Sequence, residues 1–374
     1  MKKTLSLLLA VLMLFTVAVG CSNENGGNST DSVRPDIFGE TDVTENPDEP
    51  VFSGYLFEPE PEPDESETSE TSETSETAVI PTETRPPSDI TPLLWQVTSP
   101  DGNSIYVFGS IHAADESIYP LPDYIMDAFG SSTYLAVEFD SAAVDEDPER
   151  TAQIDTALTY PEGESIFDYV SAELMVAVLD AALGITLEVD MVEGFLEYIG
   201  LANLRPFAWE TLLSGKVLEH TELSYDYGVD SFFTDEARDR GMEILDIESM
   251  ELQLEVFLGF SVPLQIASLE AHLDVEKGAE NLAMLYEAWK SGDYETILAA
   301  IDSEDEDIPE ELDLEYTTAL LTNRDINMAE VAKEYMAAEM AVFYVVGLAH
   351  LIGEDSVLGL LERAGYVVEL IAAY

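Results

Sequence analysis

An abrupt change of composition near residue 90 divides this chain of 374 residues into two unlike parts. Residues 22–90 are dominated by Glu, Asp, Ser, Thr and Pro, and they include a Thr-Ser-Glu repeat at 68–77. Such a segment has too few large apolar side chains to offset the entropy that ordering costs. We therefore expect residues 21–90 to form a disordered acidic linker and residues 91–374 to form the folded domain.

The first twenty residues have the pattern of a secretory signal. A basic start at residues 1–3 is followed by an apolar run over 5–19, which is shorter than a comfortable membrane span. The sequence Ala18-Val19-Gly20-Cys21 resembles a bacterial lipobox. That resemblance implies that residues 1–20 are removed and that lipidated Cys21 anchors the chain at the extracellular face of the bacterial cell membrane. Ordinary cleavage beside an unmodified cysteine is the alternative.

The charge balance and the cysteine count exclude several classes of protein. The chain has 77 Asp and Glu against 14 Lys and Arg, a formal net charge of −63. Nucleic-acid binding depends on cationic neutralisation of phosphates, so we expect no nucleic-acid partner. A single cysteine rules out a disulfide framework within the chain and a cysteine-rich zinc site.

Apolar runs at the two ends of the folded region predict its strands. Runs at 93–97 and 105–108 flank Pro100-Asp101-Gly102-Asn103, a turn signal that predicts a β-hairpin. Residues 154–300 are mostly helical by period. Further strands are expected at 134–138, 242–247, 341–346 and 366–370, with helices at 122–129 and 356–364. We expect an α/β fold, with α+β as the alternative, whose central sheet joins the N- and C-terminal halves around a mostly helical middle insertion.

The same four-residue motif follows two of the expected strands. Gly109-Ser110-Ile111-His112 comes after the second strand, and Gly347-Leu348-Ala349-His350 comes after the strand at 341–346. Strand ends in α/β folds are where side chains converge on a ligand, and Glu138 also ends a strand. Two His and one carboxylate form a recurrent ligand set for a catalytic divalent metal. The pattern predicts a metal site for Zn, Mn or Co; two structural histidines are the alternative.

Other candidate chemistry has less support. His220 and His272 lie in helical segments without a matching context, and the acidic run at 304–307 lacks the ligand spacing of an EF-hand. The sequence contains neither a Gly-x-Ser-x-Gly elbow nor a phosphate-binding glycine loop. Nothing in the sequence marks Ser110 as a nucleophile.

In combination, these motifs resemble the TraB/GumN family, which includes bacterial pheromone-shutdown proteins and the membrane-tethered Tiki metalloproteases. The resemblance covers nearly all of residues 93–374 and none of the linker. The family's helix motif has Asn where this chain has Asp325. Beyond the two Gly-x-x-His motifs, the resemblance rests on Leu94-Trp95-Gln96-Val97, Tyr227-Gly228-Val229-Asp230-Ser231-Phe232-Phe233, Leu245-Asp246-Ile247-Glu248-Ser249, Gln253-Leu254, and Asn323-Arg324-Asp325 with Met328-Ala329.

The resemblance implies a divalent metal site formed by His112, His350 and a carboxylate. Glu138 fits best as that carboxylate because it ends a strand near the first His. Glu248, which also follows a strand, is the rival. Either glutamate is a candidate proton acceptor.

The resemblance also implies a surface-anchored, metal-dependent hydrolase, similar to a metallopeptidase, that acts on an extracellular peptide or protein. Arg324 is a candidate to bind a substrate carboxylate or to stabilise an oxyanion, with a salt bridge as the alternative. Asp230 is a candidate to orient a metal ligand or to cap a helix. The competing function is a non-catalytic lipoprotein that binds a peptide or another ligand on the same scaffold.

Overall fold

The computed structural model describes residues 89–301 and 309–371. The predicted signal peptide, Cys21 and all but the last two residues of the predicted linker lie outside these residues. Among the helices that the structure describes, none by itself has the length and apolar character needed to cross a membrane. One sharply bent pair, Met250–Leu258 with Val262–Ala271, meets those criteria by length and composition.

Strands from both ends of the folded region form one six-stranded sheet, in the order β4-β3-β5-β2-β1-β6. β1 pairs antiparallel with β2 and β6, whereas β2, β5, β3 and β4 are parallel neighbours. The predicted hairpin and the predicted joining of the two chain ends in one sheet are confirmed. The strands are β1 (Leu94–Thr98), β2 (Ser104–Ser110), β3 (Tyr134–Val137), β4 (Glu243–Asp246), β5 (Val342–Gly347) and β6 (Val367–Ile371).

The register brings the C-terminal ends of the four parallel strands to one edge of the sheet. Ser110 of β2 is the partner of Gly347 in β5. Just beyond β3 and β4, the backbone N–H of Glu248 donates to the carbonyl of Glu138 at 2.8 Å. The residues that follow these strands therefore lie along the edge at which open α/β sheets bind ligands.

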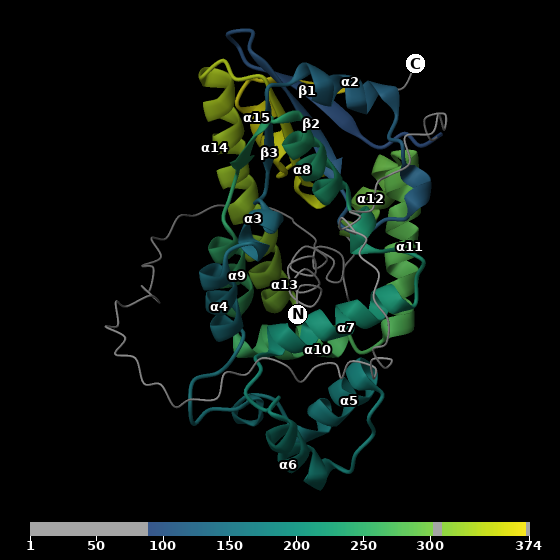
Figure 1. Cartoon of the computed structure of the whole chain (residues 1–374), viewed down its shortest axis with the longest axis vertical. Coiled ribbons are helices and arrows are strands. Elements are labelled where there is room, and N and C mark those ends of the chain that lie inside the picture. The colour runs from purple at the N-terminus through teal and green to yellow at the C-terminus, as the bar shows by residue number, and fades with distance from the viewer. Residues whose placement is uncertain (1–88, 302–308, 372–374) are drawn as a thin grey trace, which may run out of the picture. The chain divides into compact units, whose positions relative to one another are not determined.

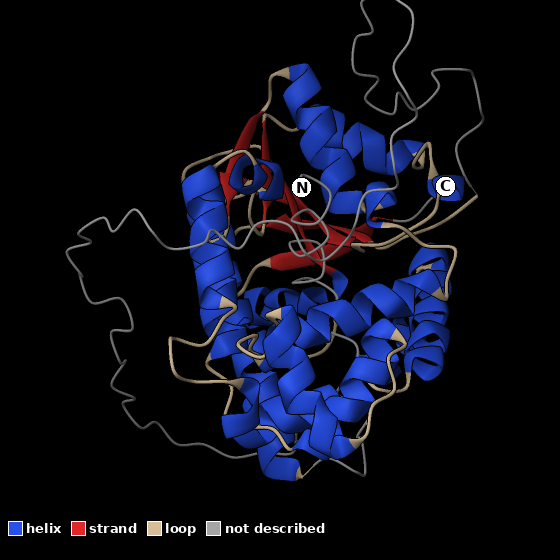
Figure 2. Ribbon diagram, turned by 60° about the horizontal axis from the view of Figure 1, so that its bottom comes forward, coloured by secondary structure: helices blue, strands red, loops and turns tan. Residues whose placement is uncertain are grey.

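Helices cover both faces of the sheet (Figure 2). On one face, Phe343 packs against Phe129 of α2 and Phe233 of α8. On the other, the hydroxyl of Tyr344 donates to the carbonyl of Met328 in α14 at 2.8 Å. The helices that share the hydrophobic core of the sheet are α2 (Asp123–Ser131), α8 (Val229–Arg240), α11 (Val275–Ser291), α12 (Tyr294–Ile301), α14 (Asn323–Ala337) and α15 (Val357–Arg363).

The helical middle region has two hydrophobic clusters of its own. The first includes Phe139, directly after Glu138, and Leu320, which lies on the turn before α14. The second is built by α5, α6, α7 and α10 around Trp209, and α5 and α6 lie away from the sheet (Figure 1). The predicted helical insertion is confirmed. Its helices are α3 (Ser141–Asp145), α4 (Pro148–Ala157), α5 (Ala172–Leu183), α6 (Val189–Ile199), α7 (Pro206–Glu219), α9 (Met250–Leu258), α10 (Val262–Ala271) and α13 (Glu310–Thr317).

Candidate functional site

The two Gly-x-x-His motifs follow neighbouring parallel strands. His112 lies two residues after β2, and His350 lies in the short 3₁₀ helix η6 (Leu348–Leu351) after β5. The His350 side chain is 1% exposed and that of His112 is 12% exposed. The pairing of β2 with β5 therefore brings two imidazoles from opposite ends of the folded region into one buried place.

Gly347 marks the point at which the predicted site residues meet. A Cβ atom on Gly347 would lie 3.3 Å from Oε1 of Glu138 and 3.5 Å from Nε2 of His112. It would also lie 3.7 Å from Cδ2 of His350. A side chain at this position would fill the space that these three groups share. The glycine leaves that space to them, and the structure thus brings His112, His350 and Glu138 together.

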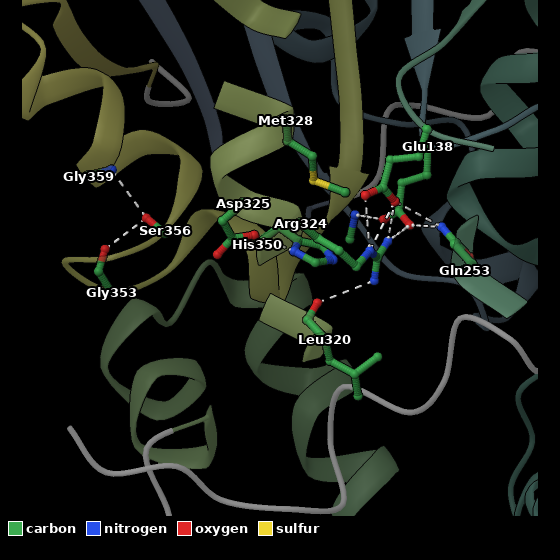
Figure 3. A network of polar contacts seen from close by, with 12 residues as sticks. Glu138, Gln253, Leu320, Arg324, Asp325, Met328, His350, Gly353, Ser356 and Gly359 are labelled. Carbon is green, nitrogen blue, oxygen red and sulfur yellow. Dashed lines mark hydrogen bonds and ion pairs between the residues drawn. The ribbon is translucent and has the colours of Figure 1, made fainter. Parts of the chain in front are cut away.

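An aspartate holds each imidazole from behind. Nδ1 of His112 lies 2.6 Å from Oδ2 of Asp230. Nδ1 of His350 lies 2.5 Å from Oδ1 of Asp325 (Figure 3). A carboxylate on Nδ1 leaves Nε2 as the nitrogen that can accept a proton or bind a metal. Metal-ligating histidines commonly donate their second N–H to a carboxylate in this way. The arrangement is therefore one that prepares both imidazoles to act as ligands.

Gly228 allows α8 to bring Asp230 to His112. The N–H of Val229 donates to the carbonyl of Ile111 at 3.0 Å, so the start of α8 lies against the backbone of the motif. A Cβ atom on Gly228 would lie only 2.4 Å from the carbonyl oxygen of His112. The N-cap of α8 is Gly228, and Asp230 is the second residue of the helix. Asp230 is therefore not the helix cap, which was the alternative, and its side chain contacts His112 instead.

Arg324 pairs with two buried glutamates. Its Nη2 lies 2.7 Å from Oε2 of Glu138 (Figure 3). The same Nη2 lies 2.7 Å from Oε2 of Glu248. Gln253 donates to the same oxygen of Glu138 at 2.8 Å and to Glu248 at 3.3 Å. The other oxygen of Glu138 accepts the N–H of Gly347 at 2.8 Å. Both oxygens of Glu138 therefore have donors, and Arg324 is placed in the salt bridge that was the alternative to substrate binding.

The site contains more acid than base. One guanidinium and two imidazoles meet four carboxyl groups, those of Glu138, Asp230, Glu248 and Asp325. Burial acts to raise the pKa of Glu138, but Arg324 and the two imidazoles outweigh it and lower the pKa to about 2. Burial acts to lower the pKa of His112, and Asp230 outweighs it, so that this pKa is raised. Positive charge on or between the imidazoles would offset the excess of acid.

The side chains present that could hold a cation beside Gly347 are the two imidazoles and Glu138. The orienting aspartates and the space beside Gly347 suit a bound ion. Oε1 of Glu138, which lies beside Gly347, accepts one hydrogen bond and keeps a second lone pair that could coordinate an ion. Within residues 89–301 and 309–371, no three His, Cys, Asp or Glu side chains form a group that could hold a metal ion. A metal at this place would therefore need either a shift of these side chains or a further ligand beside them.

The other residues considered in the sequence, Glu248, His220 and His272, do not line the space beside Gly347. The side chain of Glu248 is fully buried and is bound by Arg324, so Glu138 is the glutamate nearer to the imidazoles. His220 and His272 are the C-cap residues of α7 and α10, and each Nδ1 lies within 2.9 Å of a carbonyl of its own helix.

Sequence reasoning missed the roles of Gln253 and Asp325. Gln253 is a buried polar residue between Leu252 and Leu254 of α9, and that position was the only local signal for it. Asp325 follows a π-helical turn, η5 (Thr318–Thr322), at the start of α14. Such turns are frequent at functional sites, but the sequence does not mark them.

Comparison with known proteins identifies the family. The model of the TraB/PrgY/gumN family matches residues 93–370, a span that includes every residue of the site. The chain matches no curated protein and no solved structure. Because the family model covers well over half of the chain, this protein belongs to the TraB/PrgY/gumN family.

Proposed function

We propose that this chain is a metal-dependent hydrolase that acts on an extracellular peptide or protein and is anchored to the bacterial cell membrane through lipidated Cys21. The observation that supports this most is the pair of imidazoles beside Gly347, each held at Nδ1 by an aspartate. A divalent ion bound there, Mn, Co or Zn, would polarise a carbonyl and activate water. The peptide class of substrate rests on the family resemblance.

The charges around Glu138 and Glu248 bear on which of them could act as a proton acceptor. An efficient general base has a pKa near the working pH, and the pKa of Glu138 is about 2. This favours Glu138 as an anion that attracts and positions a cation over Glu138 as a proton acceptor. Glu248, the other candidate proton acceptor, is fully buried and bound by Arg324, so it would have to leave that ion pair in order to take a proton. Arg324 binds both carboxylates and keeps their separation fixed.

Metal analysis of the purified full chain tests this function. After incubation with Mn²⁺, Co²⁺ or Zn²⁺ and removal of free ion, we expect near-stoichiometric metal by mass spectrometry. His112→Ala with His350→Ala should abolish it, whereas His220→Ala, at an exposed helix end, should not. Circular dichroism checks that all variants are folded. A parent chain that binds none of the three ions would overturn the hydrolase assignment.

A non-catalytic ligand-binding protein is the second candidate. The observation that favours it is that Glu138 accepts hydrogen bonds from Gly347, Gln253 and Arg324 within the fold. A protein of this kind would capture a peptide without cleaving it. Equal capture from a peptide library by the parent and the double histidine variant, with no cleavage by either, would support this candidate against the first.

A further inference from the structure

Ser110 ends β2 with a hydroxyl group that lacks a partner. The residue is 3% exposed, and its Oγ is one of the few buried side-chain polar atoms of the described residues without a hydrogen bond. Burying a hydroxyl without a partner is unfavourable, because the group loses its hydrogen bonds to water and gains none in return. A partner from outside the chain would remove this cost.

The register of the sheet places this hydroxyl on the same face as the site. Ser110 and Gly347 are paired residues of adjacent parallel strands, and such residues project to the same face. The rings of Phe108 and Phe343, which precede them by two and four residues, stack at 6.0 Å and so mark that face. The absent side chain of Gly347 would point at His112, His350 and Glu138. Ser110 therefore faces the same space from one strand away.

The hydroxyl of Ser110 is placed to act as an oxygen ligand of a cation and is not arranged as a nucleophile. A nucleophilic serine has a base within hydrogen-bond reach to take its proton. In the described part of the chain, no imidazole or carboxylate bonds to Oγ of Ser110. His112 and His350 instead use Nδ1 for their aspartates. A free lone pair on Oγ is what a cation beside the imidazoles would require.

We propose that Ser110 is a further ligand of the cation site, with Oγ as a neutral oxygen donor beside His112 and His350. This inference rests on the proposed function. It supplies an oxygen ligand in addition to Oε1 of Glu138, the oxygen of that glutamate that Arg324 and Gln253 do not bond. Serine and threonine hydroxyls hold divalent ions in phosphate-binding loops, so the chemistry has precedent. An oxygen donor added to two imidazoles is compatible with Mn²⁺ as well as with Zn²⁺.

The variant Ser110→Cys gives a direct optical test with Co²⁺ as the probe. A thiolate bound to Co²⁺ produces an intense ligand-to-metal charge-transfer band in the near ultraviolet, which an unbound thiol does not. We expect this band in the full chain with Ser110→Cys. The matched control is Ser104→Cys, on the same strand and face but hydrogen-bonded to Thr98 at 2.9 Å, which should lack the band. The parent chain, which already carries Cys21, sets the background.

Affinity for Co²⁺ provides the second measurement. We expect Ser110→Ala to weaken binding about tenfold and Ser110→Thr, which keeps a hydroxyl, to restore it. Binding that depends on His112 and His350, without the band in Ser110→Cys and with unchanged affinity in Ser110→Ala, would overturn the role of Ser110 alone. Absence of Co²⁺, Mn²⁺ and Zn²⁺ binding in the parent would overturn the proposed function as well. If Ser110→Cys fails to fold, the Ala and Thr affinities decide.

Discussion

Arg324 forms ion pairs with the two buried glutamates of the site. Its side chain is 7% exposed, and the carboxylates of Glu138 and Glu248 beside it are 6% and 0% exposed. Charges removed from water in this way are stable only while they stay paired. The guanidinium therefore stabilises the fold itself, besides any part it has in chemistry.

We expect Arg324→Met to destabilise the protein by about 3–5 kcal/mol, because two glutamates would remain buried without their cation. The free energy of unfolding in urea measures this. Arg150→Met is the matched control, since Arg150 and Glu251 form an ion pair whose side chains are 31% and 42% exposed. Such exposed pairs contribute about 1 kcal/mol or less. Equal losses in the two variants would contradict a buried, charge-balancing role for Arg324.

Glu210 of α7 makes stability depend on pH. It is buried, and burial raises its pKa to about 8, with a smaller opposing effect from Ser268. The folded state therefore holds a proton that the unfolded state, with a pKa of about 4.3, releases. The associated stability is fully present below pH 4.3 and is lost as the pH rises through about 8.

We expect Glu210→Gln to remove this dependence. Relative to the parent, the variant should gain on the order of 1 kcal/mol in free energy of unfolding for each pH unit between 5 and 8. Urea titrations at several pH values measure the difference. Glu219→Gln, at the exposed end of the same helix, should follow the parent curve. Parallel curves for the parent and Glu210→Gln would show that Glu210 is ionised in the fold.

At the scale of elements, the start of α8 is held against the backbone of the first Gly-x-x-His motif. We expect Gly228→Ala to destabilise the protein by about 1–3 kcal/mol, because its Cβ would meet the His112 carbonyl at 2.4 Å. Thermal unfolding with circular dichroism detection measures this. Gly194→Ala is the control: this glycine lies within α6, and a Cβ atom there would meet nothing beyond its own helix within 4 Å. There alanine should stabilise by about 0.5–1 kcal/mol. A similar effect in both variants would count against the contact.

Local patterns were sufficient to predict most of the elements. The hairpin of β1 and β2 was predictable because alternating apolar residues flank a turn sequence that contains Gly102, and Gly102 has a φ of 91°. The order of the parallel strands was not predictable. The insertion of β5 between β3 and β2 depends on contacts between residues far apart in the sequence, which local periodicity does not encode.

The site was predictable only as far as its residues follow strands. His112, His350 and Glu138 each come after a predicted strand, and that position suggested a common edge. The aspartates behind the imidazoles come from α8 and α14, so their roles depend on how helices pack on the sheet. The bridging of two glutamates by Gln253 and Arg324 depends on the same packing. No spacing in the sequence links these residues.

At the scale of the whole molecule, a net charge of −63 makes repulsion a general destabilising term. We expect the melting temperature to rise as NaCl increases from about 0.02 to about 0.3 M, because the screening length falls from about 20 Å to below about 10 Å. Differential scanning calorimetry measures the rise. KCl should act equally, since screening does not distinguish the two cations. A melting temperature that falls with either salt would contradict repulsion as the controlling term.

The position of β5 at the centre of the sheet also determines when, during synthesis, the residues of the site can come together. A ribosome produces His112 and Glu138 before His350, and β5 must enter between β2 and β3 before these three side chains can meet. A nascent chain, or one truncated before residue 342, therefore has an interrupted sheet and half of a histidine pair. The three side chains can therefore meet only after β5 has been made and has entered the sheet.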